Sequence, residues 1–298
     1  MKFGAVFPTT EIGKDPVAIR DFAQAAEGLG FSHLLTYDHV VGAVHEGRTP
    51  ALTGPYTERH QFHEPFVLFS YLAGITNRLR FSTGVLVLPQ RQTVLVAKQA
   101  AELALLSSGR FRLGVGTGWN YVEYDALGAD FDKRGPILEE QVHFLRKLWS
   151  APAIDFDGKF HKIERAGINP LPPEPIQIWM GGFSQLALER AVRTGDGFIF
   201  TFHPKSPDQA RTLPSLFDKY GRDPKTFGIE YIQDFAAGPD AWHQAVRTWE
   251  AIGASYFTIQ TMVPNVREGA AGRFSTPEQH IQALAAFMAE MKGYSAVV

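Results

Sequence analysis

A carboxylate and a histidine stand next to each other in the segment TYDHVV, residues 36–41. The run before them, residues 33–38, has the composition of a short strand, so Asp38 and His39 fall where that strand ends. Histidine can give or take a proton near neutral pH. We therefore predict Asp38 and His39 as catalytic residues, although neighbouring residues on a strand point to opposite faces and need not touch. The alternative is a histidine that only bonds to its own loop.

Glycines recur in the segment GVGTGWN, residues 114–120, within and after another β-rich run. Such glycines could let the backbone crowd against a phosphate, as in the dinucleotide-binding fingerprint G-x-G-x-x-G. That fingerprint opens a helix, but Trp119 takes the place of its third glycine and we predict no helix there. These glycines therefore need an explanation other than a dinucleotide-binding turn.

A second glycine pair lies in IWMGGFS, residues 178–184. A strand is predicted to end at Met180, and Ser184 can cap a helix that runs to about Thr194. Free backbone N–H groups and the positive end of the helix dipole would favour a phosphate there. The alternative is a tight turn whose helix ends at Gly195. The predicted phosphate-binding residues are Gly181, Gly182, Phe183 and Ser184.

We predict no metal site. Residues 40–65 contain several histidines and acids, but no H-E-x-x-H motif and no H-x-H on the first strand. The chain has no cysteine, which excludes disulfides, a thiol nucleophile and thiolate metal ligands. It also has no G-x-S-x-G elbow and no Walker A lysine.

Eight short β-rich runs alternate with helical patterns over the 298 residues. This alternation predicts an α/β fold, a (β/α)8 TIM barrel formed as a single domain over residues 1–298, with a doubly wound sheet as the alternative. The predicted strands are residues 2–7, 33–38, 80–88, 111–116, 176–180, 197–202, 227–232 and 255–260. The predicted helices are residues 16–29, 64–76, 93–107, 134–149, 184–194, 207–220, 240–252 and 276–291.

Two long connections follow predicted strands, at residues 40–65 and 261–274. Both would lie on the C-terminal face of a barrel, where active sites are found. We predict that these insertion loops are lids over the site.

The charge balance points to a small-molecule partner. A formal net charge of -2 argues against nucleic acid or an anionic membrane, which attract basic surfaces. The N-terminal run MKFGAVFP is too short for a secretory signal, and no apolar stretch approaches a membrane span. We therefore expect a cytoplasmic protein.

Several motifs in this order resemble the luciferase-like flavin monooxygenases, and most closely the oxidoreductases that use the deazaflavin coenzyme F420. The similarity is dense from residue 1 to about residue 202 and is most specific over residues 79–120. The motifs are YDHV, EPF, the run LRFSTGVLVLPQRQTVLVAKQAAELALLSSGRFRLGVGTGWN, LGADFDKRGPILEE, IWMGGFS and GDGF.

This resemblance implies a (β/α)8 barrel, usually dimeric, that binds reduced flavin or deazaflavin at the C-terminal ends of its strands. Asp38 and His39 would lie beside the reactive ring carbon, and the phosphate would bind at MGGFS. A bulge with a non-prolyl cis peptide is expected at Gly84–Val85, behind the ring. Gly116 and Gly118 would give the flat ring room to approach, and Trp119 could line the pocket. The further ring-binding residues implied are Thr117 and Asn120.

The function implied is hydride transfer between coenzyme F420 and a small organic substrate, with His39 as proton donor or acceptor, in a homodimer. One alternative is a monooxygenase that uses reduced FMN on the same barrel. Another is a flavin-binding protein without catalysis, against which the intact YDH motif argues.

Overall fold

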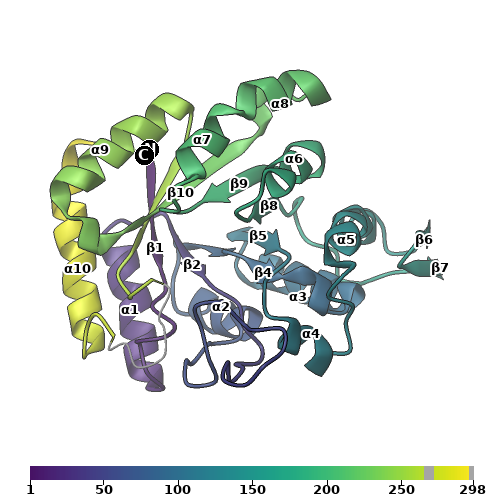
Figure 1. Ribbon diagram of the computed structural model, residues 1–298, viewed down its shortest axis with the longest axis horizontal. Helices are drawn as coiled ribbons and strands as arrows, with labels where there is room; N and C mark the ends of the chain where they lie inside the picture. The colour runs from purple at the N-terminus through teal and green to yellow at the C-terminus, as the bar shows by residue number, and fades with distance from the viewer. Residues whose placement is uncertain (265–271, 295–298) are drawn as a thin grey trace.

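Eight parallel strands close into a barrel in the computed structural model, which describes residues 1–264 and 272–294 (Figure 1). The strands pair in the order β3-β2-β1-β11-β10-β9-β8-β5, and β5 pairs back to β3. This closure confirms the predicted (β/α)8 barrel and excludes the doubly wound sheet. The barrel strands are β1 (Lys2–Val6), β2 (His33–Thr36), β3 (Arg80–Thr83), β5 (Phe111–Gly116), β8 (Ile178–Gly181), β9 (Gly197–Phe200), β10 (Gly228–Asp234) and β11 (Tyr256–Gln260).

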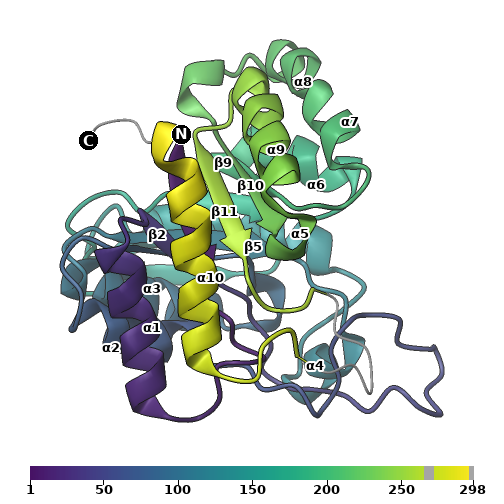
Figure 2. The same ribbon diagram turned by 90° about the vertical axis from the view of Figure 1, so that its left-hand side faces the viewer.

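The helices surround this barrel (Figures 1 and 2). Their starts follow local signals: Asp15 caps the first helix, and Thr276 and Gln279 form the capping box that opens the last. The predicted helix 207–220 is in fact two helices, because Pro214 stands in the first turn of the second. The helices are α1 (Pro16–Gly28), α2 (Pro65–Ala73), α3 (Thr93–Leu106), α5 (Arg134–Leu148), α6 (Gln185–Thr194), α7 (Ser206–Arg211), α8 (Leu213–Tyr220), α9 (Pro239–Ile252) and α10 (Pro277–Glu290).

Within the described residues, a short strand, a hairpin of two strands and a short helix are additional to the predicted elements. Residues 80–88 form two strands, β3 and the short β4 (Leu86–Val87), with Gly84 and Val85 between them. An antiparallel hairpin, β6 (Ile154–Asp157) and β7 (Lys162–Ala166), projects from the barrel (Figure 1). The prediction that no helix begins near Trp119 was wrong, since α4 (Tyr121–Ala126) starts there. Asn120 caps it by accepting a hydrogen bond from the Val122 N–H at 3.1 Å.

A buried polar network fills the barrel near the starts of its strands. The Glu230 carboxylate pairs with Arg112 and with His33 Nε2, the latter at 2.8 Å, and accepts a hydrogen bond from Thr258. Burial raises the pKa of Glu230, but Arg112 and His33 outweigh it and lower this pKa to about 2. The Arg112 guanidinium also lies 4.0 Å from the ring centroid of Trp179. The charges are thus matched within the network, which occupies the end of the barrel away from the predicted site.

Within the described residues, no helix is both long and apolar enough to cross a bilayer. The predicted lid at 261–274 falls partly on residues 265–271, which lie outside the described part of the chain. Its two flanks are joined: the N–H groups of Val263 and Phe274 both donate to the carboxylate of Glu11, at 2.7 and 3.3 Å.

Candidate active site

The C-terminal ends of the barrel strands carry the predicted site. Asp38 and His39 follow β2, the Gly84–Val85 pair follows β3, and Gly181 ends β8. In Figure 2 the arrowhead of β11 points toward α4 and the long loop after β2, so these insertions lie on the C-terminal face. Parallel strands meet with their C-terminal ends on one side, which is why residues far apart in sequence gather here.

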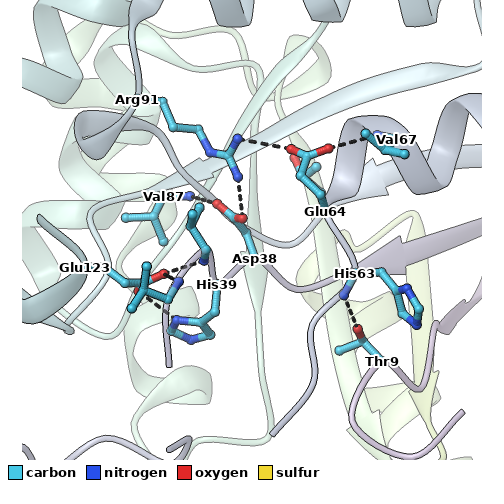
Figure 3. A network of polar contacts seen from close by, with 12 residues as sticks. Thr9, Asp38, His39, His63, Glu64, Val67, Val87, Arg91 and Glu123 are labelled. Carbon is cyan, nitrogen blue, oxygen red and sulfur yellow. Dashed lines mark hydrogen bonds and ion pairs between the residues drawn. The ribbon is translucent and has the colours of Figure 1, made fainter. Parts of the chain in front are cut away.

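His39 is held by a glutamate that the sequence analysis did not identify. Its Nδ1 lies 2.8 Å from Glu123 Oε2, and the backbone N–H groups of Val40 and Val41 donate to Glu123 Oε1 (Figure 3). Burial raises the pKa of Glu123, but the hydrogen bonds from His39 and these two amides outweigh it and hold the pKa below its usual value. Glu123 is therefore a carboxylate at neutral pH, and it leaves His39 Nε2 as the nitrogen free for a ligand.

Aromatic rings surround this histidine. The ring centroids of Tyr56, Phe62 and Trp119 lie 5.4, 4.8 and 5.7 Å from that of His39, each in an edge-on arrangement. Burial raises the pKa of Tyr56, so its phenol stays protonated near neutral pH. Only 10% of the His39 side chain is exposed. The histidine thus lies in an apolar surrounding that contains one fixed negative charge.

Asp38 points elsewhere, as expected for neighbouring residues at a strand end. Its Oδ1 is 2.7 Å from Arg91 Nη2, and its Oδ2 accepts a hydrogen bond from the Val87 N–H at 2.9 Å (Figure 3). Burial lowers the pKa of Arg91, but Asp38 and Glu64 outweigh it and raise this pKa. Both Asp38 oxygens are therefore occupied by the chain itself, and Asp38 pairs with Arg91 whereas His39 pairs with Glu123.

The peptide bond between Gly84 and Val85 is cis, as predicted. It lies between β3 and β4 and places Val85 against a second apolar cluster, distinct from the main core. A Cβ on Gly84 would lie 2.4 Å from a methyl of Leu35, so no larger residue fits there without movement. The cluster gives the bulge an apolar floor. Its buried members are Val6, Leu35, Trp179, Ile199, Ile232 and Met262.

The glycines at the end of β5 and just after it lie close to valine side chains. A Cβ on Gly116 would lie 2.5 Å from Val85 Cγ2, and one on Gly118 would lie 2.7 Å from Val87 Cγ1. Gly181 has the same relation to Val85, at 2.9 Å. These three glycines thus leave room for the side chains of Val85 and Val87. That Gly116 and Gly118 also leave room for a ring stays a prediction.

The two other predicted ring contacts are also used within the chain. Asn120 caps α4 with Oδ1, and its Nδ2 donates to the Val41 carbonyl at 3.2 Å. The Thr117 carbonyl accepts a hydrogen bond from the Tyr124 hydroxyl at 2.7 Å. Asn120 therefore ties α4 to the start of the long loop, and its contact with a ring stays a prediction.

The predicted phosphate cradle has the expected local structure. Ser184 caps α6, its Oγ accepting from the Ala187 N–H at 3.2 Å. Among the described residues, none accepts a hydrogen bond from the backbone N–H groups of residues 183–186. The Phe183 carbonyl is tied to Gln209 Nε2 at 3.0 Å. The turn is thus fixed, with a row of free donors at a helix N-terminus, which suits an anion.

A substitution at Gly182 can test the predicted phosphate cradle. The φ of Gly182 is +154°, and a Cβ would lie 2.9 Å from Ala187 Cβ, so Gly182→Val must displace the turn from the helix end. We expect at least about tenfold weaker cofactor binding, or about 1.4 kcal/mol, with folding largely kept. Gly253→Val is the matched control, because Gly253 also has a positive φ, ends α9 and has no neighbour within 4 Å. Equal affinities of the two variants would place the phosphate elsewhere.

Sequence reasoning thus missed Glu123 and Arg91. Glu123 had a detectable signal, since an N-cap residue followed three positions later by glutamate is typical of a helix start. Arg91 had none. Within residues 1–264 and 272–294, no group of three or more His, Asp or Glu side chains is arranged to hold a metal ion.

Comparison with known proteins adds a family match and several relatives. A family model described as luciferase-like monooxygenase matches residues 1–289. An uncharacterized protein of Mycobacterium tuberculosis is 37% identical over 181 residues, which are 59% of this chain and only 62% of that relative. The F420-dependent glucose-6-phosphate dehydrogenase of Kribbella flavida is 33% identical over 248 residues, 78% of this chain and 70% of that enzyme.

Two further matches are more distant. The pyrimidine monooxygenase of Acinetobacter baylyi is 30% identical over 200 residues, 63% of this chain and 52% of that enzyme. The structure of an F420-dependent secondary alcohol dehydrogenase superimposes with a TM-score of 0.75, covering 99% of each chain at 15% identity. At that identity the likeness concerns the fold.

Proposed function

Because this chain belongs to the luciferase-like monooxygenase family, we propose that it is an oxidoreductase that moves a hydride between coenzyme F420 and a small organic substrate. His39 is its acid–base residue. The observation that carries this proposal is the His39–Glu123 pair, at 2.8 Å, on the C-terminal face of the barrel. The relatives found include an F420-dependent dehydrogenase and a monooxygenase. Both support a redox role, and the choice of cofactor is the finer part of the proposal.

Glu123 prepares His39 for proton transfer. A carboxylate beside Nδ1 favours the tautomer with its proton on Nδ1, which leaves Nε2 as a base. When Nε2 takes a proton, the same carboxylate stabilises the imidazolium. The aromatic rings of Tyr56, Phe62 and Trp119 keep water away and strengthen this electrostatic effect. The pair can thus act in either direction of the reaction.

The residues at the strand ends fit a flavin-like group. The bulge at Gly84–Val85 presents backbone over an apolar cluster, which suits a flat ring. The turn at Gly182 and the capped start of α6 offer free N–H groups to a phosphate. A bound deazaflavin would supply or accept the hydride, while the chain binds, orients and exchanges the proton. Asp38 is then a residue that fixes the pocket and does not itself exchange the proton.

Two observations favour the deazaflavin over FMN. The F420-dependent relative aligns over 78% of this chain, against 63% for the pyrimidine monooxygenase. A poised proton donor or acceptor is also what hydride transfer to or from a carbonyl or an activated alkene requires. The second candidate, a monooxygenase that uses reduced FMN and oxygen, is supported by the family description and by that pyrimidine monooxygenase.

The cofactor choice is tested by binding. Purified protein is titrated separately with F420 and with FMN while the fluorescence of each ring is followed. We expect F420 to bind with a Kd on the order of micromolar or below, and FMN to bind much more weakly. Equal or tighter FMN binding would instead support the monooxygenase.

We also propose that the protein is a homodimer that uses the outer faces of α2 and α3. These two neighbouring helices expose apolar side chains, with 70% of Val67 and 52% of Leu95 accessible. Burying such a face against a second copy removes apolar surface from water. Light scattering should give twice the mass of the 33.1 kDa chain, and Leu95→Lys should shift this mass toward the monomer. A monomeric native protein would contradict the proposal.

A further inference from the structure

The long loop after β2 begins and ends at residues that share one arginine. Asp38 directly precedes residues 39–63, and Glu64 directly follows them. Arg91 contacts both: Nη2 lies 2.7 Å from Asp38 Oδ1, and Nη1 lies 3.1 Å from Glu64 Oε1 (Figure 3). One guanidinium therefore joins the two ends of a 25-residue segment. Arg91 lies just before α3, so it belongs to the barrel and not to the loop whose ends it joins.

Each carboxylate is also fixed by the backbone beyond the loop. Asp38 accepts a hydrogen bond from the Val87 N–H at the end of β4, and Glu64 caps α2 by accepting from the Val67 N–H at 2.8 Å. Asp38 is fully buried and Arg91 is only 13% exposed. The Glu64 side chain is 36% exposed, so the contact between Asp38 and Arg91 is the buried half of the link. That half differs from a solvated surface ion pair, which contributes little.

The enclosed segment carries much of the proposed active site. His39 is its first residue, and Tyr56 and Phe62 supply two of the three rings around it. Its other ties to the body include hydrogen bonds, such as those of Val40 and Val41 to Glu123, and ring contacts, such as that of His45 with Trp119 at 5.8 Å. The position of the His39 ring relative to its surrounding rings therefore depends on how the base of this loop is closed.

We propose that Arg91 is a positioning residue that closes the base of the loop 39–63 and so holds His39 and its aromatic surrounding in register. The consequence for turnover rests on the proposed function, whereas the closure of the loop does not. Arginine suits this role better than lysine, because its planar fork can donate to two carboxylates at once from fixed directions.

The test is hydrogen exchange of the protein without cofactor, in matched variants. Arg91→Met removes the link, and Arg110→Met is the control. Arg110 also donates to several carbonyl oxygens, but it lies just before β5, at the opposite end of the barrel. We expect amide exchange within residues 40–62 to be faster by at least about tenfold in Arg91→Met, with α5 unchanged. Arg110→Met should leave exchange in residues 40–62 at the native rate.

Two further variants keep the test decisive if Arg91→Met folds poorly. Glu64→Gln removes the charge from one end of the link and leaves Asp38 paired, so it should speed exchange mainly near residues 56–62. Arg91→Lys keeps the charge but not the fork, and its exchange rates should fall between those of Arg91→Met and the native protein. Native exchange in residues 40–62 of both Arg91→Met and Glu64→Gln would overturn the proposal.

Measurements of turnover and of F420 binding distinguish the proposed role of Arg91 from the proposed function of the protein. With a turned-over substrate, Arg91→Met should lower kcat by at least about tenfold while the F420 Kd changes less than about threefold, and Arg91→Lys should recover part of kcat. A native kcat in an Arg91→Met variant whose loop exchanges faster would overturn the link to His39. Faster exchange in a protein that neither binds F420 nor turns over substrate would support the closure and contradict the proposed function.

Discussion

The His39→Asn variant should turn over at least about 10²-fold more slowly than the native protein, while its affinity for coenzyme F420 changes by less than about threefold. Asparagine can still donate a hydrogen bond to Glu123, so the start of the loop keeps its anchor. It has no group that titrates near neutral pH, however. A positioned acid or base acts on the rate, whereas a residue that only lines the pocket acts chiefly on binding.

The pH profile should lose one limb in this variant. Glu123 has a pKa held below its usual value, and Tyr56 has one raised by burial, so neither changes charge near neutral pH. A limb between about pH 5 and 8 then belongs to a histidine.

The measurement is kcat and kcat/KM against pH, with a substrate found by screening activated alkenes, quinones, aldehydes and alcohols. His161→Asn is the control, since His161 pairs with Glu140 at 2.8 Å at the hairpin β6–β7. A native rate with the limb intact in His39→Asn would show that His39 only shapes the pocket.

The eight barrel strands could be predicted because each is a short β-rich run closed by glycine, proline or a polar turn. The run 111–116, for example, corresponds to β5 without any difference in its ends. The helices followed from capping residues such as Asp15 and Ser184, whose side chains accept the expected backbone hydrogen bonds. Local chemistry decides these features, so a single sequence contains them.

The pairings at the site could not be predicted in the same way. Glu123 is 84 residues from His39, and Arg91 is 53 residues from Asp38. The partner of each charged side chain depends on how the C-terminal ends of the strands come together in the barrel. Residue spacing in the sequence does not contain this information. Glycine is ambiguous for a similar reason: Gly116 indicates a close approach but does not say of what, and here the approaching group is Val85.

Glu123→Gln should have an effect of similar size to that of His39→Asn, although Glu123 has no need to touch the substrate. The glutamine keeps an oxygen for the N–H groups of Val40 and Val41, so the loop retains its anchor. Its Nε2, however, would face His39 Nδ1 as a donor. The proton of a neutral His39 would then move to Nε2, and the nitrogen meant to act as a base would carry a hydrogen. A similar exchange of carboxylate for amide costs about 10⁴-fold in the serine protease triad.

We therefore expect kcat to fall by about 10² to 10⁴-fold in Glu123→Gln, with the F420 Kd and the melting temperature little changed. Glu140→Gln is a close control within the same chain. Glu140 likewise accepts from backbone N–H groups, those of residues 159–161, and pairs with a histidine through Nδ1 at 2.8 Å, but it does so at the β6–β7 hairpin. Any general cost of replacing such a carboxylate should appear in both variants, and only Glu123→Gln should lose turnover. Equal activities in the two variants would mean that the tautomer of His39 does not limit the reaction, and the proton would then have to pass through another group or through water.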